Sequence, residues 1–167
     1  MKVVLDTNVL ISGIFFGGLP RAVLDAWAEE RFELLVSPLI FDEYVRTCDR
    51  LSASHPGLEY QSILASIIGH GKLLPDSTSS DSITADPDDD KFMLCARGRG
   101  VIIVSGDQHL LDAAGWEGVR VMKPHNFLDY LNNPDATLRR QSSISEEEPA
   151  HLESTRLGAE LRVACPS

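Results

Sequence analysis

The feature that most constrains this chain is a regular alternation of short apolar runs with segments in which apolar residues recur at helical spacing. The runs are rich in β-branched residues, which is typical of buried strands. They are Lys2–Leu5, Phe32–Val36, Val101–Val104 and Val119–Met122, with a shorter candidate at Lys72–Leu74. Because helices separate the strands, the connections are crossovers and the strands run parallel. The sequence therefore predicts an α/β fold around a central parallel sheet.

Helical segments fill the gaps between these strands. We expect Thr7 to be the N-cap of the first helix, and Pro20 to open the second after a break at Gly17 and Gly18. The remaining predicted helices are 38–49, 58–68, 90–97, 110–114 and 124–131. Residues 76–89 form a long polar loop, and loops of this length in a compact domain are usually functional or mobile.

Four carboxylates stand where this fold would bring them together. Asp6 and Asp107 each follow a predicted strand, and Asp90 stands where a helix begins. Glu43 lies among apolar residues of another helix, where a carboxylate needs a partner. Parallel sheets bind ligands at the carboxyl ends of their strands, so three of these acids would meet there and Glu43 could join them. Carboxylates this close repel one another, and a divalent metal ion would hold them.

The neighbours of these acids allow both functional and structural interpretations. Asn8 and Ser105 could orient a carboxylate or a bound water. Asp6 could equally be a simple helix cap, because Asp after a strand often has that role. We interpret His109 as a surface residue of a short helix rather than as a general base.

The third acid lies in a run of four aspartates, Asp86, Asp88, Asp89 and Asp90. A solvated turn with a helix cap is the plain interpretation of such a run. This run leads directly into an apolar helix face, however. Asp90 at the helix start can meet the positive end of the helix dipole while it faces the sheet edge. Asp88 is the alternative ligand or a supporting acid, and Asp86 and Asp89 are weaker candidates.

Several rival sites are excluded by missing motifs. The chain has no G-x-x-x-x-G-K-[ST] phosphate loop, no G-x-G-x-x-G fingerprint, no Cys/His zinc cluster and no G-x-S-x-G elbow. A site with only oxygen ligands favours Mg²⁺, for which Mn²⁺ could substitute. The net charge of −10 argues against a broad basic nucleic-acid surface, although it does not exclude a nucleic-acid substrate.

The sequence also bears on location. Cys48, Cys95 and Cys165 are odd in number and widely spaced, which fits a reducing cytosol better than a disulfide framework. No apolar run approaches the roughly 18 residues of a membrane span. The chain enters a strand at once, so we expect no secretory signal. These features predict a cytoplasmic protein without a membrane partner.

Four motifs together resemble the PIN-domain family, and most closely its toxin–antitoxin toxin branch. They are VVLDTNVLIS at 3–12, LVSPLIFDEY at 35–44, DPDDDKF at 86–92 and VSGDQHLL at 104–111. The resemblance implies a three-layer α/β/α sandwich with a metal-dependent RNA-cleaving site. The family's four acids map by motif to Asp6, Glu43, Asp90 and Asp107, as catalytic residues and as metal ligands. The family's hydroxyl position after the fourth strand is usually Thr and here is Ser105.

The resemblance covers residues 1–131, which we expect to be the nuclease domain. We expect residues 132–167 to be a mobile C-terminal tail that carries no chemistry. The implied function is that of an endoribonuclease that hydrolyses single-stranded RNA as the toxin of a toxin–antitoxin pair. An antitoxin partner and a homodimer are implied with it.

Two alternatives stay open. The chain could be a non-catalytic or inhibited PIN-fold binding module whose acids hold a structural ion. It could also be an acidic-site phosphotransferase, although Asn8 stands where a phosphatase of the haloacid dehalogenase type needs a second aspartate.

Overall fold

The computed structural model describes residues 1–134 except 56, 58, 78–81 and 99. Its strands are β1 (Lys2–Leu5), β2 (Glu33–Val36), β3 (Lys72–Leu73), β4 (Ile102–Val104) and β5 (Arg120–Met122). Every pairing is parallel, and the strand order is β3-β2-β1-β4-β5. The predicted parallel sheet is therefore confirmed.

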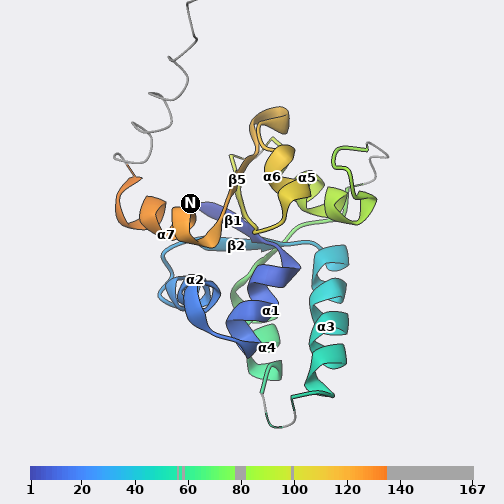
Figure 1. The fold of residues 1–167 in the computed structure, drawn as a ribbon, viewed down its shortest axis with the longest axis vertical. Helices are drawn as coiled ribbons and strands as arrows, with labels where there is room; N and C mark the ends of the chain where they lie inside the picture. The colour runs from blue at the N-terminus through green and yellow to red at the C-terminus, as the bar shows by residue number, and fades with distance from the viewer. Residues whose placement is uncertain (56, 58, 78–81, 99, 135–167) are drawn as a thin grey trace, which may run out of the picture.

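Helices connect the strands and cover both faces of the sheet. They are α1 (Thr7–Phe15), α2 (Gly18–Ala28), α3 (Pro38–Ser52), α4 (Gln61–His70), α5 (Asp90–Ala96), α6 (Gln108–Asp112) and α7 (Pro124–Asn132), with 3₁₀ turns η1 (Pro87–Asp89) and η2 (Trp116–Gly118). Figure 1 shows α1 to α4 on one side of the sheet and α5 and α6 on the other, and α7 contacts α2. This arrangement is the expected three-layer α/β/α sandwich.

The two central strands form the middle of the core. Val3, Val4 and Leu5 of β1 and all three residues of β4 are fully buried. Strands that are covered on both faces have continuous apolar sequences, which explains why both strands stand out as apolar runs in the sequence. Cys48 and Cys95 are buried in the same core.

Helix α1 meets α2 closely and at a sharp bend. The axes change direction by 96° across Gly17, whose φ of 78° favours glycine. A Cβ added to Gly13 would lie 2.7 Å from the Leu24 side chain and 2.8 Å from the Pro20 carbonyl oxygen, so only glycine permits this approach. Within the described residues, no single helix is long and apolar enough to cross a membrane, and α1 and α2 meet that test only as a bent pair.

Several helix boundaries in the structure differ from the predicted ones. The helix predicted for 58–68 begins at Gln61 and reaches His70, because apolar spacing does not mark helix ends. The predicted N-cap Thr7 is wrong: Asp6 caps α1, and its side chain accepts a hydrogen bond from the Asn8 backbone N–H. The boundary of the tail at residue 132 stays a prediction, since residues 135–167 lie outside the described part.

The register of the sheet sets up the site. Leu5 of β1 lies opposite Val104 of β4, so the residues that follow them, Asp6 and Ser105, leave the sheet side by side. The fully buried Tyr44 on α3 donates a hydrogen bond from its hydroxyl to the Leu5 carbonyl oxygen. This bond ties the end of β1 to α3, the helix that carries Glu43.

Candidate functional site

Asp6 is held at both of its carboxylate oxygens. One accepts the Asn8 backbone N–H at 3.2 Å, and the other accepts the Ser105 hydroxyl at 2.6 Å. Ser105 is fully buried and accepts the Asp107 backbone N–H at 2.9 Å. One hydroxyl therefore fixes the ends of two neighbouring strands, and with them the relative position of Asp6 and Asp107.

Asp107 has a structural role and also lies near Asp6. It caps α6 by accepting the His109 backbone N–H at 2.7 Å. Burial raises the pKa of Asp6 above its ordinary value, against the hydrogen bonds from Ser105 and Asn8. Repulsion by Asp107 and Glu43 adds to the rise. Asp6 and Asp107 can therefore each cap a helix and still lie close enough together to bind one metal ion.

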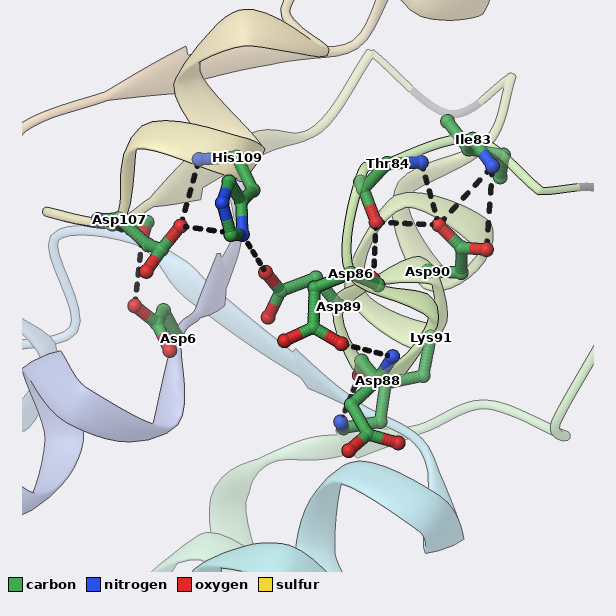
Figure 2. Close-up of polar contacts among 11 residues, drawn as sticks. Asp6, Ile83, Thr84, Asp86, Asp88, Asp89, Asp90, Lys91, Asp107 and His109 are labelled. Atoms are coloured by element: carbon green, nitrogen blue, oxygen red, sulfur yellow. Dashed lines mark hydrogen bonds and ion pairs between the residues drawn. The ribbon is translucent and has the colours of Figure 1, made fainter.

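Asp89, at the end of η1, is the aspartate of the run that joins these acids. Its carboxylate points towards His109 and the side of the site where Asp6 and Asp107 lie (Figure 2). Burial raises the pKa of Asp89 to about 6, and repulsion by Asp107, Asp6 and Asp86 adds to the effect. A carboxylate whose charge is opposed in this way gains most from a bound cation.

Asp90 does not face the sheet edge as we expected. Its carboxylate accepts the Thr84 backbone N–H and hydroxyl, each at 2.7 Å, and the Ile83 backbone N–H at 3.2 Å. Desolvation opposes its ionisation, but these donors outweigh it and hold the pKa of Asp90 below its ordinary value. Figure 2 shows Asp90 turned towards Ile83 and Thr84, away from Asp6. Asp90 thus closes the loop that leads into α5.

The other members of the run are spread around this turn. Asp88 is exposed, and it takes part through its backbone: its N–H donates to the Asp86 carboxylate at 3.0 Å, and its carbonyl accepts from Lys91. Asp86 is also exposed and caps η1. Asn8 bonds Asp6 through its backbone N–H, whereas we expected a role for its side chain.

Glu43 is joined to a lysine. Its Oε2 lies 2.5 Å from Lys91 Nζ, and the two side chains are 30% and 16% exposed. The partner that an acid among apolar residues requires is therefore Lys91, the second residue of α5. Glu43 still contributes to the repulsion felt by Asp6, so its charge lies near the other acids.

A second group of possible ligands surrounds Asp89. One nitrogen of His109 and one oxygen each of Asp86 and Asp89 lie within 4.8 Å of one another. His109 Nδ1 is also 3.7 Å from the nearer Asp107 oxygen. We had interpreted His109 as a plain surface residue, and its position beside two of the acids was missed.

One signal in the sequence could have indicated Asp89. Phe92, Met93 and Ala96 are three of the buried residues of α5, and Asp89 lies three, four and seven residues before them. Those spacings are the ones that share a helix face. Side chains of adjacent helical residues point about 100° apart. The Asp90 carboxylate therefore points away from the face that Asp89 shares with these residues.

A family model for the PIN domain matches residues 2–109 of this chain. The chain belongs to the PIN-domain family. The PIN-domain match runs from β1 into α6, and it contains every acid described above. PIN domains are typically metal-dependent nucleases, and the acidic cluster at this sheet edge could bind a metal ion.

One relative aligns with about two thirds of this chain. An uncharacterized protein of Methanocaldococcus jannaschii is 31% identical over 115 residues, which is 66% of this chain and 74% of that protein. Its printed name gives no activity, so the similarity carries no argument about the function.

Proposed function

We propose that this PIN-domain protein is a metal-dependent endoribonuclease that hydrolyses phosphodiester bonds of single-stranded RNA. The observation that carries the proposal is the approach of Asp6, Asp107 and Asp89 to one another at the carboxyl edge of the sheet, within the segment that matches the PIN domain. We propose Asp6, Glu43, Asp107 and Asp89 as the ligands of the metal ion. Asp89 takes the role of third acid that the motif resemblance assigned to Asp90. Carboxylate oxygens suit Mg²⁺, and Mn²⁺ could replace it.

The chain's own groups prepare this site. A divalent ion supplies positive charge that lowers the pKa of a bound water and offsets the charge of the transition state. Ser105 holds Asp6 and Asp107 in fixed relation, and Lys91 holds Glu43. Asp6 is 3% exposed and hydrogen-bonded at both oxygens, which disfavours it as the nucleophile of a phosphotransferase.

The charge pattern bears on how RNA would be held. Four of the basic side chains pair with acids in the described part of the chain: Arg21 with Asp25, Lys72 with Glu33, Lys91 with Glu43 and Arg97 with Glu117. These local pairs offset their charges. We therefore expect the bound metal ion, rather than a basic surface, to supply much of the attraction for the phosphate backbone.

Replacing Asp6 tests the activity directly. We expect Asp6→Asn to lower RNA cleavage with Mg²⁺ or Mn²⁺ by at least about 100-fold, as removal of an electrostatic catalytic group commonly does. Asp112→Asn is the matched control, because Asp112 is exposed on α6, where it accepts a hydrogen bond from the Gln108 side chain. Cleavage by Asp6→Asn at the wild-type rate would contradict the proposal. A wild-type protein that binds Mn²⁺ but cuts no RNA would favour the binding-module alternative.

We propose further that the protein acts as the toxin of a toxin–antitoxin pair in the cytoplasm, with an antitoxin partner and as a homodimer. The motif resemblance supports this role, and exposed large apolar side chains provide surface for protein contacts: Phe16, Leu19, Leu39, Ile68 and Leu73. Induced expression should arrest growth with the wild type but not with Asp6→Asn. Light scattering after gel filtration should give the mass of a dimer.

We propose that residues 1–131 make up the nuclease unit. The last described helix, α7, ends at Asn132, where the Arg31 guanidinium donates to the Asn132 side chain at 2.8 Å. A chain shortened after residue 134 keeps that contact. It should unfold at the same temperature as the full chain and cut RNA at the same rate, and a loss of either would give the tail a role.

A further inference from the structure

His109 lies between acids that come from two different elements. Its Nδ1 is 3.9 Å from Asp89 Oδ2 and 3.7 Å from Asp107 Oδ1, and Figure 2 shows the ring between these two carboxylates. Asp107 precedes α6, whereas Asp89 ends η1. The imidazole thus joins the strand-end acids to the aspartate run.

We propose that His109 is a nitrogen ligand of the metal ion, and that the site therefore selects a first-row transition-metal ion over Mg²⁺. The inference rests on the proposed function, because it assigns one more ligand and a cofactor class to the same site. His109 stands in a group of possible ligands with Asp89 and Asp86, and it adds to the ligands proposed above, Asp6, Glu43, Asp107 and Asp89.

The distances suit an ion between these groups. Two atoms that bind one small divalent ion at about 2.1 Å each lie at most about 4.2 Å apart. His109 Nδ1 and Asp89 Oδ2, at 3.9 Å, satisfy that limit. The ligand atoms of the group with Asp86 all lie within 4.8 Å of one another, and a small rotation of the exposed Asp86 side chain would bring them within reach of one ion.

The backbone holds His109 where a ligand is needed. Its N–H donates to Asp107, so the residue is fixed on the first turn of α6 directly beside that acid. Its side chain is 50% exposed, which leaves the ring room to turn towards an ion. An imidazole that binds a metal ion through Nδ1 carries no proton on that nitrogen. A metal-bound His109 would therefore not form an ion pair with Asp89.

The nitrogen donor decides the choice of metal. Carboxylate and water ligands suit Mg²⁺, whereas imidazole suits transition metals. Affinity for such sites rises from Mn²⁺ through Fe²⁺ to Co²⁺. A site with carboxylates alone would leave Mg²⁺, the ion expected from the sequence, at less disadvantage.

Pulsed EPR of the full chain loaded with Mn²⁺ tests the coordination directly. We expect ¹⁴N modulation from a histidine nitrogen in the wild type and none in His109→Gln. His125→Gln is the matched control, because His125 lies 3.4 Å from Asp129 on α7, outside the acidic site. It should keep the signal. A wild-type spectrum without nitrogen coupling would overturn the inference.

Calorimetric titration with Co²⁺ and Mg²⁺ tests the selectivity. His109→Gln should raise the Kd for Co²⁺ by at least about tenfold and change that for Mg²⁺ far less, since loss of groups that support a metal commonly costs 10- to 100-fold. Equal changes for both ions would refute a nitrogen ligand. Mn²⁺ binding that needs Asp6 but shows no nitrogen coupling would exclude His109 as a ligand and leave the proposed function standing. Absence of any metal binding would contradict the proposed function as well.

Discussion

Asp89 and Asp90 are neighbours with opposite electrostatic environments, and replacing each by Asn should give opposite results. Asp90 is 8% exposed and accepts hydrogen bonds from Thr84 and Ile83. In Asp90→Asn the new NH₂ group cannot accept from these donors, and the negative charge they stabilise is lost. Hydrogen bonds to charged groups contribute about 1.5–3 kcal/mol each. Because one acceptor oxygen remains, we expect a loss of about 2–3 kcal/mol, or roughly 6–9 °C in Tm for a chain of this size.

Asp89→Asn should instead stabilise the metal-free protein. Burial and repulsion by the other acids raise the pKa of Asp89 from 3.8 to about 6. At 1.36 kcal/mol per pKa unit, that opposition to its charge amounts to about 3 kcal/mol. Its side chain is 18% exposed, so solvent screening reduces the gain to about 1–2 kcal/mol. Cleavage should fall by at least about 100-fold, because a ligand of the proposed metal ion is gone.

The two variants are compared in two measurements. Thermal unfolding with a chelator at pH 7.5 reports the metal-free fold, and RNA cleavage with saturating metal at 25 °C reports the site. We expect Asp90→Asn to be less stable but still active, and Asp89→Asn to be stable but inactive. An inactive Asp90→Asn of unchanged Tm, together with an active Asp89→Asn, would show that Asp90 is the ligand and that the side-chain directions argued here are wrong.

Three further predictions concern Ser105, Gly13 and the pH dependence of stability. Ser105→Ala should reduce cleavage and cost about 1–3 kcal/mol, because it removes the donor to Asp6 and leaves buried groups unsatisfied, and Ser105→Thr should restore both activity and Tm. Gly13→Ala should cost about 1–3 kcal/mol in urea unfolding, because the added Cβ would lie 2.7 Å from Leu24, and an unchanged midpoint would mean that α1 and α2 are not so close. The raised pKa of Asp89 makes the folded protein bind more protons than the unfolded chain between about pH 4 and 6. Its contribution to the stability of the metal-free protein should therefore rise as the pH falls from 7 to 4, and this dependence should be absent in Asp89→Asn.

The class of fold and the positions of two of the acids can be predicted from the sequence alone. The apolar runs at β1 and β4 are buried on both faces and need no tertiary information to be read as strands. Asp6 and Asp107 follow those strands directly, and because parallel strands end at one edge, their approach could be predicted from position alone. The need of Glu43 for a partner was also foreseeable, from its apolar neighbours.

The strand order, and which aspartate of the run faces the site, depend on contacts between distant parts of the chain. The hydrophobic pattern of a strand does not specify which strand it pairs with. The pairing of β4 with β1 therefore cannot be predicted from local sequence. The direction of Asp89 depends on η1, and that of Asp90 on donors from Thr84 and Ile83 across the loop. The side chains of adjacent helical residues point about 100° apart. Hydrogen bonds such as those from Thr84 and Ile83 to Asp90 therefore decide which of two adjacent carboxylates can reach a metal ion.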